Sequence, residues 1–119
     1  MTTLSSLAYV FPGQGSQFVG MLADLAPHYQ EVTQTFDEAS SVLGYDLWAL
    51  VEKGPADQLD QTIYTQPALL TASYAIWRIL DSRLPAKPSI LAGHSLGEYT
   101  ALVCAKALQF QEAVTLVAA

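Results

Sequence analysis

The sequence Gly93-His94-Ser95-Leu96-Gly97 places a serine between two glycines in the spacing Gly-x-Ser-x-Gly. In enzymes with a nucleophilic serine, this spacing forms a sharp turn between a strand and a helix. The glycines permit the tight bend, and the serine hydroxyl is raised at a helix N-terminus, where N–H groups favour developing negative charge. Ser95 is therefore the candidate nucleophile, and the Leu96 N–H is the candidate first oxyanion donor. A structural turn without chemistry is the competing interpretation.

A second glycine-rich segment, PGQGSQ at residues 12–17, follows an apolar run. A phosphate-binding loop is excluded because no Lys-Ser or Lys-Thr pair follows and Gly-x-Gly-x-x-Gly is not completed. Hydrolase-like sites take the second oxyanion donor from another strand-to-helix loop. We therefore predict that the main-chain N–H of Gln14 faces Ser95, with a turn that has no chemistry as the alternative.

The elements that must position these turns can be predicted from hydrophobic periodicity. Short apolar runs at 7–11 and 89–92 predict two buried strands. Because helical segments separate and follow them, we expect an α/β fold with a parallel sheet that is covered on its faces. The predicted helices run from Phe18 or Val19 to about Leu25, from Tyr29 to Leu43, from Asp46 to Leu50, from Pro55 to Leu59, from Pro67 to Leu84, from Glu98 to Lys106, and onward from Gln111.

Composition limits the class of protein. Hydrophobic residues make up 51% of the 119 residues and charged residues only 13%, which predicts a chain buried on more than one side, by an oligomer or by further sequence. The net charge of −6 and the lack of a basic run make nucleic acid and membrane poor partners. A single cysteine, Cys104, fits a reducing compartment. The N-terminus has no basic region typical of a signal peptide, so we expect a cytoplasmic protein.

Three motifs together resemble the malonyl-CoA:acyl carrier protein transacylases of bacterial type II fatty-acid synthesis. They are FPGQGSQ at 11–17, TQPAL at 65–69 and GHSLGEY at 93–99, in the expected order. The likeness runs from about Tyr9 to the end of the chain, and acyltransferase domains of polyketide synthases share the same motifs. The resemblance implies an α/β-hydrolase-like acyltransferase domain built on a parallel sheet.

The resemblance also implies a two-step reaction. Ser95 attacks the thioester of malonyl-CoA to form a malonyl-serine ester, and the phosphopantetheine thiol of acyl carrier protein then takes the malonyl group. The N–H groups of Gln14 and Leu96 hold the oxyanion, and His94 and Gln66 belong to the substrate pocket. No metal and no other cofactor is implied, since the coenzyme A thioester and phosphopantetheine are substrates.

Three family features are missing from the sequence. The family's histidine base lies far downstream, whereas this chain has only His28 and His94. The arginine that binds the malonyl carboxylate belongs in the helix that begins at Gln111, and the ferredoxin-like subdomain is also absent. We therefore interpret residues 1–119 as a truncated N-terminal part of the acyltransferase domain. We expect this fragment alone to be inactive, because a serine without a base is a weak nucleophile.

Two other functions stay open at this point. A serine esterase or patatin-like hydrolase also uses a strand-Gly-x-Ser-x-Gly-helix turn, although the first and third motifs argue against it. A non-catalytic product that binds partners or folds in part is the other alternative. The choice among malonyl, methylmalonyl and acetyl groups is not determined by these residues.

Overall fold

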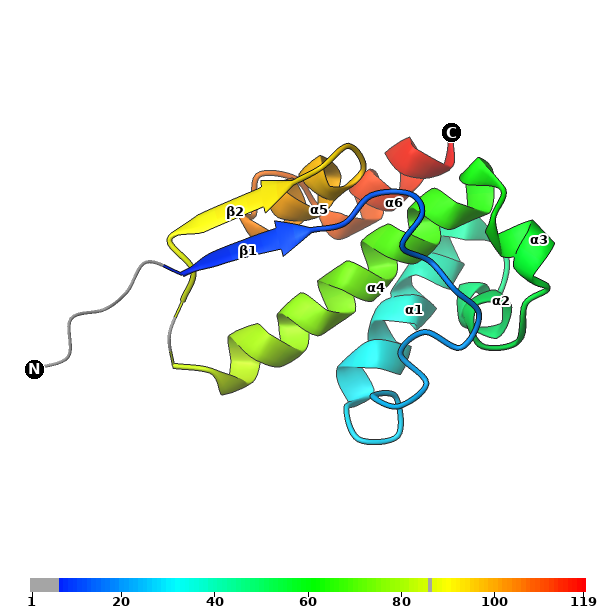
Figure 1. The fold of residues 1–119 in the computed structure, drawn as a ribbon, viewed down its shortest axis with the longest axis horizontal. Coiled ribbons are helices and arrows are strands. Elements are labelled where there is room, and N and C mark those ends of the chain that lie inside the picture. Colours follow the sequence, from blue (N-terminus) through cyan, green and yellow to red (C-terminus); the bar gives the residue numbers. More distant parts are fainter. Residues whose placement is uncertain (1–6, 86) are drawn as a thin grey trace, which may run out of the picture.

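The computed structural model describes residues 7–85 and 87–119, which form two strands and six helices (Figure 1). Strands β1 (Ala8–Phe11) and β2 (Ile90–Gly93) are separated by α1 (Gln30–Leu43), α2 (Leu47–Lys53), α3 (Ala56–Leu59) and α4 (Thr62–Arg83), and are followed by α5 (Gly97–Cys104) and α6 (Phe110–Ala118). Residues 1–6, on which the signal-peptide prediction depends, lie outside the described part. No helix within the described residues has the length and apolar character needed to span a bilayer.

The two strands are parallel neighbours, as the α/β prediction requires. Tyr9 lies opposite Leu91, and Phe11 lies opposite Gly93. Both strands therefore end at the same edge of the sheet. This register brings the glycine loop that follows Phe11 and the serine turn that follows Gly93 to neighbouring positions.

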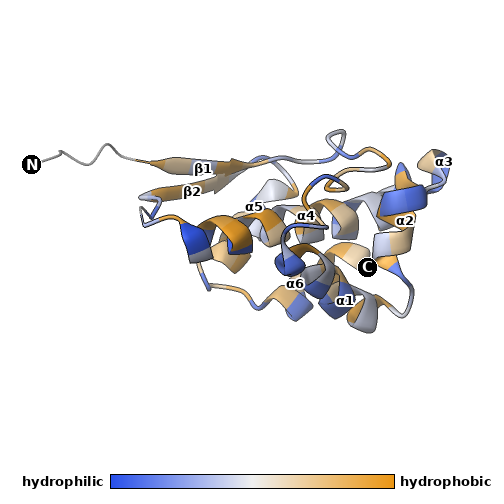
Figure 2. Cartoon of the chain, turned by 90° about the horizontal axis from the view of Figure 1, so that it is seen from below, coloured by the Kyte–Doolittle hydropathy of each residue, from blue (hydrophilic) through white to orange (hydrophobic). Residues whose placement is uncertain are grey.

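The prediction that both strands are buried is wrong for the described residues. Figure 2 shows the helices on one side of the strands. Phe11 is buried against Ala101 and Cys104 of α5, whereas Val10 is 74% exposed and Ile90 is 58% exposed. An apolar strand sequence has the same pattern whether one face or both faces are covered, so the pattern alone could not reveal the open face.

The segment between β1 and α1 is not helical, which corrects the helix predicted from Phe18 or Val19 to Leu25. Residues 19–28 form successive turns. Leu22 has a φ of 65°, in the left-handed region that interrupts a right-handed helix. Met21 is nevertheless buried in the core, so its apolar neighbours anchor this segment without helix formation.

Helices α1 and α2, which follow this segment, confirm the predicted caps. Gly44 ends α1 with a φ of 83°, and its N–H donates to the carbonyl of Ser40. The Asp46 carboxylate accepts a 3.0 Å hydrogen bond from the N–H of Ala49 at the start of α2. These contacts fix the path of the chain toward α3 and α4.

Helix α4 begins at Thr62, five residues before the predicted start at Pro67, and therefore contains that proline. A proline inside a helix leaves the carbonyl four residues earlier without its N–H partner. That carbonyl belongs to Ile63, a residue that is 55% exposed. Burial of Pro67 and of the following residues against α1, α5 and α6 outweighs the lost bond.

The core lies between α4 and the helices around it. Its largest fully buried hydrophobic side chains are Phe36, Leu47, Leu59, Leu70, Val32, Val51 and Val114. Helix α5 ends at Cys104, two residues before the predicted end, and Lys106 has a φ of 64°. Helix α6 begins at Phe110, one residue earlier than predicted.

Candidate functional site

Ser95 lies at the apex of the turn that joins β2 to α5. Its φ of 57° places a residue with a β-carbon in the left-handed region, a conformation that non-glycine residues rarely adopt. The N–H groups of Gly97 and Glu98 donate 3.0 Å hydrogen bonds to the carbonyls of His94 and Ser95, which closes the turn. The Ser95 side chain is exposed at this apex.

The two glycines of the turn are required by close packing. A β-carbon on Gly93 would lie 1.9 Å from the carbonyl carbon of Gly97, and one on Gly97 would lie 2.1 Å from the carbonyl oxygen of Phe11. Both distances are far below van der Waals contact and involve backbone atoms. The turn is therefore packed directly onto the end of β1, where the glycine loop begins.

The glycine loop is in contact with the serine turn. A β-carbon on Gly13 would lie 2.8 Å from the carbonyl oxygen of His94 and 3.5 Å from the β-carbon of Ser95. The N–H of His94 also donates to the carbonyl of Phe11 at 3.3 Å. Two turns separated by some eighty residues of sequence therefore meet at the carboxyl edge of the sheet.

Two main-chain N–H groups near this contact are unused. Within the described residues, neither the N–H of Gln14 nor that of Leu96 donates a hydrogen bond to another protein group. Leu96 is buried immediately before α5, and Gln14 is exposed next to Gly13. An exposed hydroxyl with one free N–H on the next residue and another in the contacting loop is a combination that could stabilise a tetrahedral oxyanion.

The glutamine side chains of the loop form hydrogen bonds that sequence analysis missed. Gln14 Nε2 donates to Thr62 Oγ1 at 2.9 Å, and Gln17 Nε2 donates to Asp60 Oδ1 at 3.0 Å. Gln17 Oε1 also accepts from the N–H of Gly15 at 2.8 Å. The two glutamines flanking Gly15 were a visible signal, but their partners lie too far along the chain to be identified by spacing.

The other candidate residues are less closely placed. His94 is exposed, and its Nδ1 would lie 3.7 Å from a β-carbon on Gly13. Gln66 is half-buried on α4, and no hydrogen bond of the described residues links it to Ser95. The structure therefore brings together the serine turn and the glycine loop and leaves Gln66 as a separate candidate.

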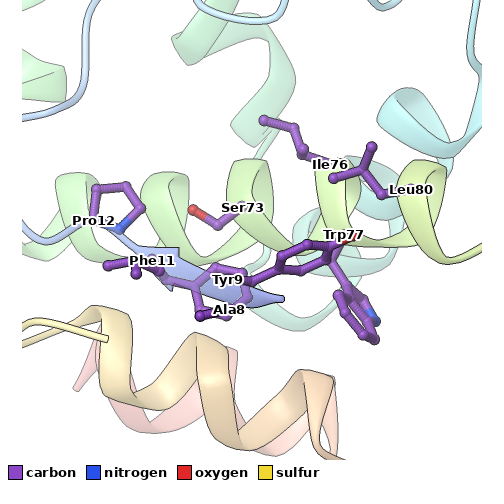
Figure 3. Close-up of a pocket in the computed structure, with 9 residues that line it drawn as sticks. Ala8, Tyr9, Phe11, Pro12, Ser73, Ile76, Trp77 and Leu80 are labelled. Carbon is purple, nitrogen blue, oxygen red and sulfur yellow. The ribbon is translucent and has the colours of Figure 1, made fainter. Parts of the chain in front are cut away.

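A cavity of about 340 Å³ lies between β1 and α4, away from these candidates (Figure 3). Its lining includes Phe11, Ser73 and the pair Tyr9 and Trp77, whose rings meet edge to face with centroids 5.6 Å apart. Ser95, Gln14, Leu96, His94 and Gln66 do not line it. The cavity is thus an apolar space beside the sheet, distinct from the serine turn.

Comparison with known families gives a match over almost the whole chain. The model of the acyl transferase domain matches residues 8–119. Malonyl CoA-acyl carrier protein transacylase of Salmonella typhimurium is 58% identical over 114 residues, which are 96% of this chain and 37% of that protein. The protein of the same name from Haemophilus influenzae is 60% identical over 115 residues, with the same two shares. The chain thus spans a little over one third of the length of these relatives.

Solved structures show the same likeness in three dimensions. The acyl carrier protein S-malonyltransferase of Vibrio cholerae superposes with a TM-score of 0.94 at 63% identity, covering 96% of this chain and 37% of that one. A malonyl-transacylase in complex with its type II PKS acyl-carrier protein gives a TM-score of 0.94 at 60% identity, with the same coverage. The arrangement of strands and helices described above therefore also occurs in these structures.

Proposed function

We propose that this chain, which belongs to the acyl transferase domain family, carries the nucleophile of a malonyl transfer reaction, and that this nucleophile is Ser95. In the complete protein, the malonyl group passes from malonyl-CoA to the phosphopantetheine thiol of acyl carrier protein. The names of the relatives and the solved complex with an acyl-carrier protein support this choice of donor and acceptor.

The reaction has two half-steps that use the same oxygen. Ser95 Oγ bonds to the malonyl carbonyl carbon, the carbon–sulfur bond breaks, and coenzyme A leaves as a thiol after taking up the proton that the serine loses. The thiol of the acyl carrier protein then attacks the malonyl-serine ester. Its sulfur takes the malonyl group, and its proton returns to Ser95.

Each half-step passes through a tetrahedral intermediate with a negatively charged oxygen. The N–H groups of Gln14 and Leu96 are the donors that we assign to this oxyanion. One observation carries the assignment: the loop and the turn touch at Gly13 and Ser95, where a β-carbon on Gly13 would lie only 3.5 Å from that of Ser95. The N–H groups on the adjoining residues are free of other partners within the described residues.

Ser95 has no base in the described part of the chain. No hydrogen bond among these residues involves its hydroxyl, and His94 occupies the adjacent position on the same sharp turn. A serine hydroxyl without a base is a weak nucleophile. We therefore expect residues 1–119 alone to form little or no malonyl ester, and we assign the activity to the complete protein.

The test is the intact mass of the complete protein after incubation with malonyl-CoA. We expect a gain of one malonyl group that persists until a thiol acceptor is added, and no gain in the Ser95→Ala variant. Rapid release of free malonate without an acceptor would indicate a hydrolase. Equal labelling of Ser95→Ala and the unaltered protein would show that another residue is the nucleophile.

A further inference from the structure

We infer that the side chains of Gln14 and Gln17, with their partners Thr62 and Asp60, are positioning residues for the reaction. They hold the glycine loop so that the Gln14 N–H stays at the oxyanion of Ser95. This inference rests on the proposed function, because it assigns a role to that N–H.

Apart from the packing of Gly13 against the serine turn, the loop has few other restraints. Within the described residues, segment 12–17 makes no main-chain to main-chain hydrogen bond. The next such bond along the chain joins the N–H of Gly20 to the carbonyl of Val51 at 2.8 Å. The hydrogen bonds that hold residues 12–17 are therefore those of the two glutamine side chains.

The side chain of Gln17 connects the turn at Gly15 to the end of α3. Its Oε1 accepts from the N–H of Gly15 at 2.8 Å, which fixes the turn, and its Nε2 donates to Asp60 Oδ1 at 3.0 Å, which fixes the turn to the end of α3. Gln14 adds a second connection, to Thr62 Oγ1 at 2.9 Å at the start of α4. The loop is thus attached on both sides of Gly15 to one short junction, residues 60–62.

The junction itself is held by a buried side chain. Thr65 is fully buried, and its hydroxyl hydrogen bonds to the carbonyl of Leu59 and, at 3.0 Å, to that of Gln61. Leu59 is buried in the core next to it. The threonine of the TQPAL motif therefore fixes the two backbone segments that carry Asp60 and Thr62.

These connections affect the reaction more than the stability of the fold. The partners are exposed, and an exposed hydrogen bond contributes little net free energy of folding because water replaces it. An oxyanion donor, by contrast, is effective only when it lies within hydrogen-bond distance of the charge that develops. Loss of the Gln17 hydrogen bonds should therefore lower kcat, while KM and the melting temperature change little.

A charge substitution with its own rescue tests this in the complete protein. Gln17→Glu keeps an oxygen for the N–H of Gly15 but places a carboxylate against that of Asp60. Adding Asp60→Asn supplies an amide N–H that can donate to the new carboxylate. We expect Gln17→Glu to lower kcat for malonyl transfer about tenfold with KM within about twofold. The double variant should regain most of that loss.

A control and a second measurement separate the possible failures. Gln61→Ala alters an exposed neighbouring glutamine without a side-chain hydrogen bond in the described region, so it should keep the unaltered kcat. Hydrogen exchange of the peptide that covers residues 12–17 should be faster in Gln17→Glu and slower again in the double variant.

The outcomes are distinguishable. If the unaltered protein forms no ester on Ser95, the proposed function is wrong and the positioning role falls with it. If the ester forms but Gln17→Glu keeps the unaltered kcat, or Asp60→Asn fails to rescue it, only the positioning role is overturned. Unchanged hydrogen exchange in Gln17→Glu would also overturn the positioning role, because the Gln17 hydrogen bonds would then not restrain the loop.

Discussion

Gly13 and His94 approach so closely that a β-carbon on Gly13 would lie 2.8 Å from the carbonyl oxygen of His94. The same β-carbon would lie 3.5 Å from the β-carbon of Ser95. Only glycine allows this separation between the loop and the serine turn without moving backbone atoms. The contact therefore fixes how closely the glycine loop packs against the serine turn.

Replacing Gly13 with alanine should separate the loop from the turn. The added methyl group meets a carbonyl oxygen of the backbone, so the loop must shift, and the Gln14 N–H would move away from the oxyanion position that we propose. In other enzymes, removal of one oxyanion donor lowers the rate by about 10²–10³, so a displaced donor should lower it about tenfold or more. The rate of malonyl-ester formation on Ser95 in the complete protein measures this.

A matched control is Gly44→Ala. Gly44 has a φ of 83° but nothing within 4 Å of its added β-carbon, so the change strains the C-terminus of α1 without touching the site. It should cost about 1 kcal/mol of unfolding free energy and leave ester formation unchanged. If Gly13→Ala forms the ester as fast as this control, the close contact has no role in the reaction.

Gly97→Ala should prevent the serine turn from forming. The added β-carbon would lie 2.1 Å from the carbonyl oxygen of Phe11. Phe11 ends β1 and Gly97 belongs to the serine turn, so the clash lies within the backbone that carries the site. Such overpacking should cost about 3 kcal/mol or more of unfolding free energy. Urea denaturation compared with Gly44→Ala checks this. A loss no larger than that of the control would mean that the turn can rearrange.

Much of the site could be predicted because its signals are local. The serine turn is encoded by five adjacent residues, and the strands and caps by runs of four to fifteen residues, so Ser95, Gly44 and Asp46 lie where expected. The glycine loop was predicted as the partner of that turn because hydrolase-like sites take a second oxyanion donor from another strand-to-helix loop.

What could not be predicted depends on contacts between distant residues. The start of α4 was missed because a proline usually ends or begins a helix, and only burial of the residues after Pro67 explains why the helix tolerates it. The partners of Gln14 and Gln17 were missed because they come from the junction before α4. The open face of the sheet was missed because apolar strands look alike whether covered or not.

Cys104 should be unreactive in the folded protein. The residue is 5% exposed. Burial raises the pKa of its thiol to about 12, and the charge of Asp81 adds to the increase. The thiolate is the reactive form, so iodoacetamide at pH 8.5 should label Cys104 only after unfolding in urea. Rapid labelling of the folded protein would contradict the buried position.

The raised pKa of Cys104 predicts that the folded protein loses stability at high pH. The folded state keeps the Cys104 proton while the unfolded state loses it above about pH 9, so the unfolding free energy should fall between about pH 9 and pH 12. Cys104→Ala removes this contribution, although it also leaves a small gap in the core. The unfolding free energy of the variant should therefore decline less steeply over that range, and an equal slope would contradict the raised pKa.

Arg78 should contribute more to stability than the more exposed Arg83. The Arg78 guanidinium donates to Glu38 at 2.5 Å and 3.2 Å and to Thr35 Oγ1 at 3.0 Å, and it lies 4.4 Å from the centre of the Tyr74 ring. Burial acts to lower the pKa of Arg78, but the hydrogen bonds to Glu38 and the proximity of Tyr74 outweigh it and raise the pKa, so the group stays charged when partly buried.

Arg78→Met keeps the apolar stem but removes the charge, leaving Glu38 and the buried Thr35 hydroxyl without this partner. We expect a loss of about 1–2 kcal/mol of unfolding free energy in urea denaturation. Arg83→Met is the matched control, because the Arg83 side chain is 46% exposed where it pairs with Glu31 and water can replace that pair. Arg83→Met should therefore cost clearly less, and an equal loss in the two variants would show that the setting around Arg78 adds nothing to an ordinary surface ion pair.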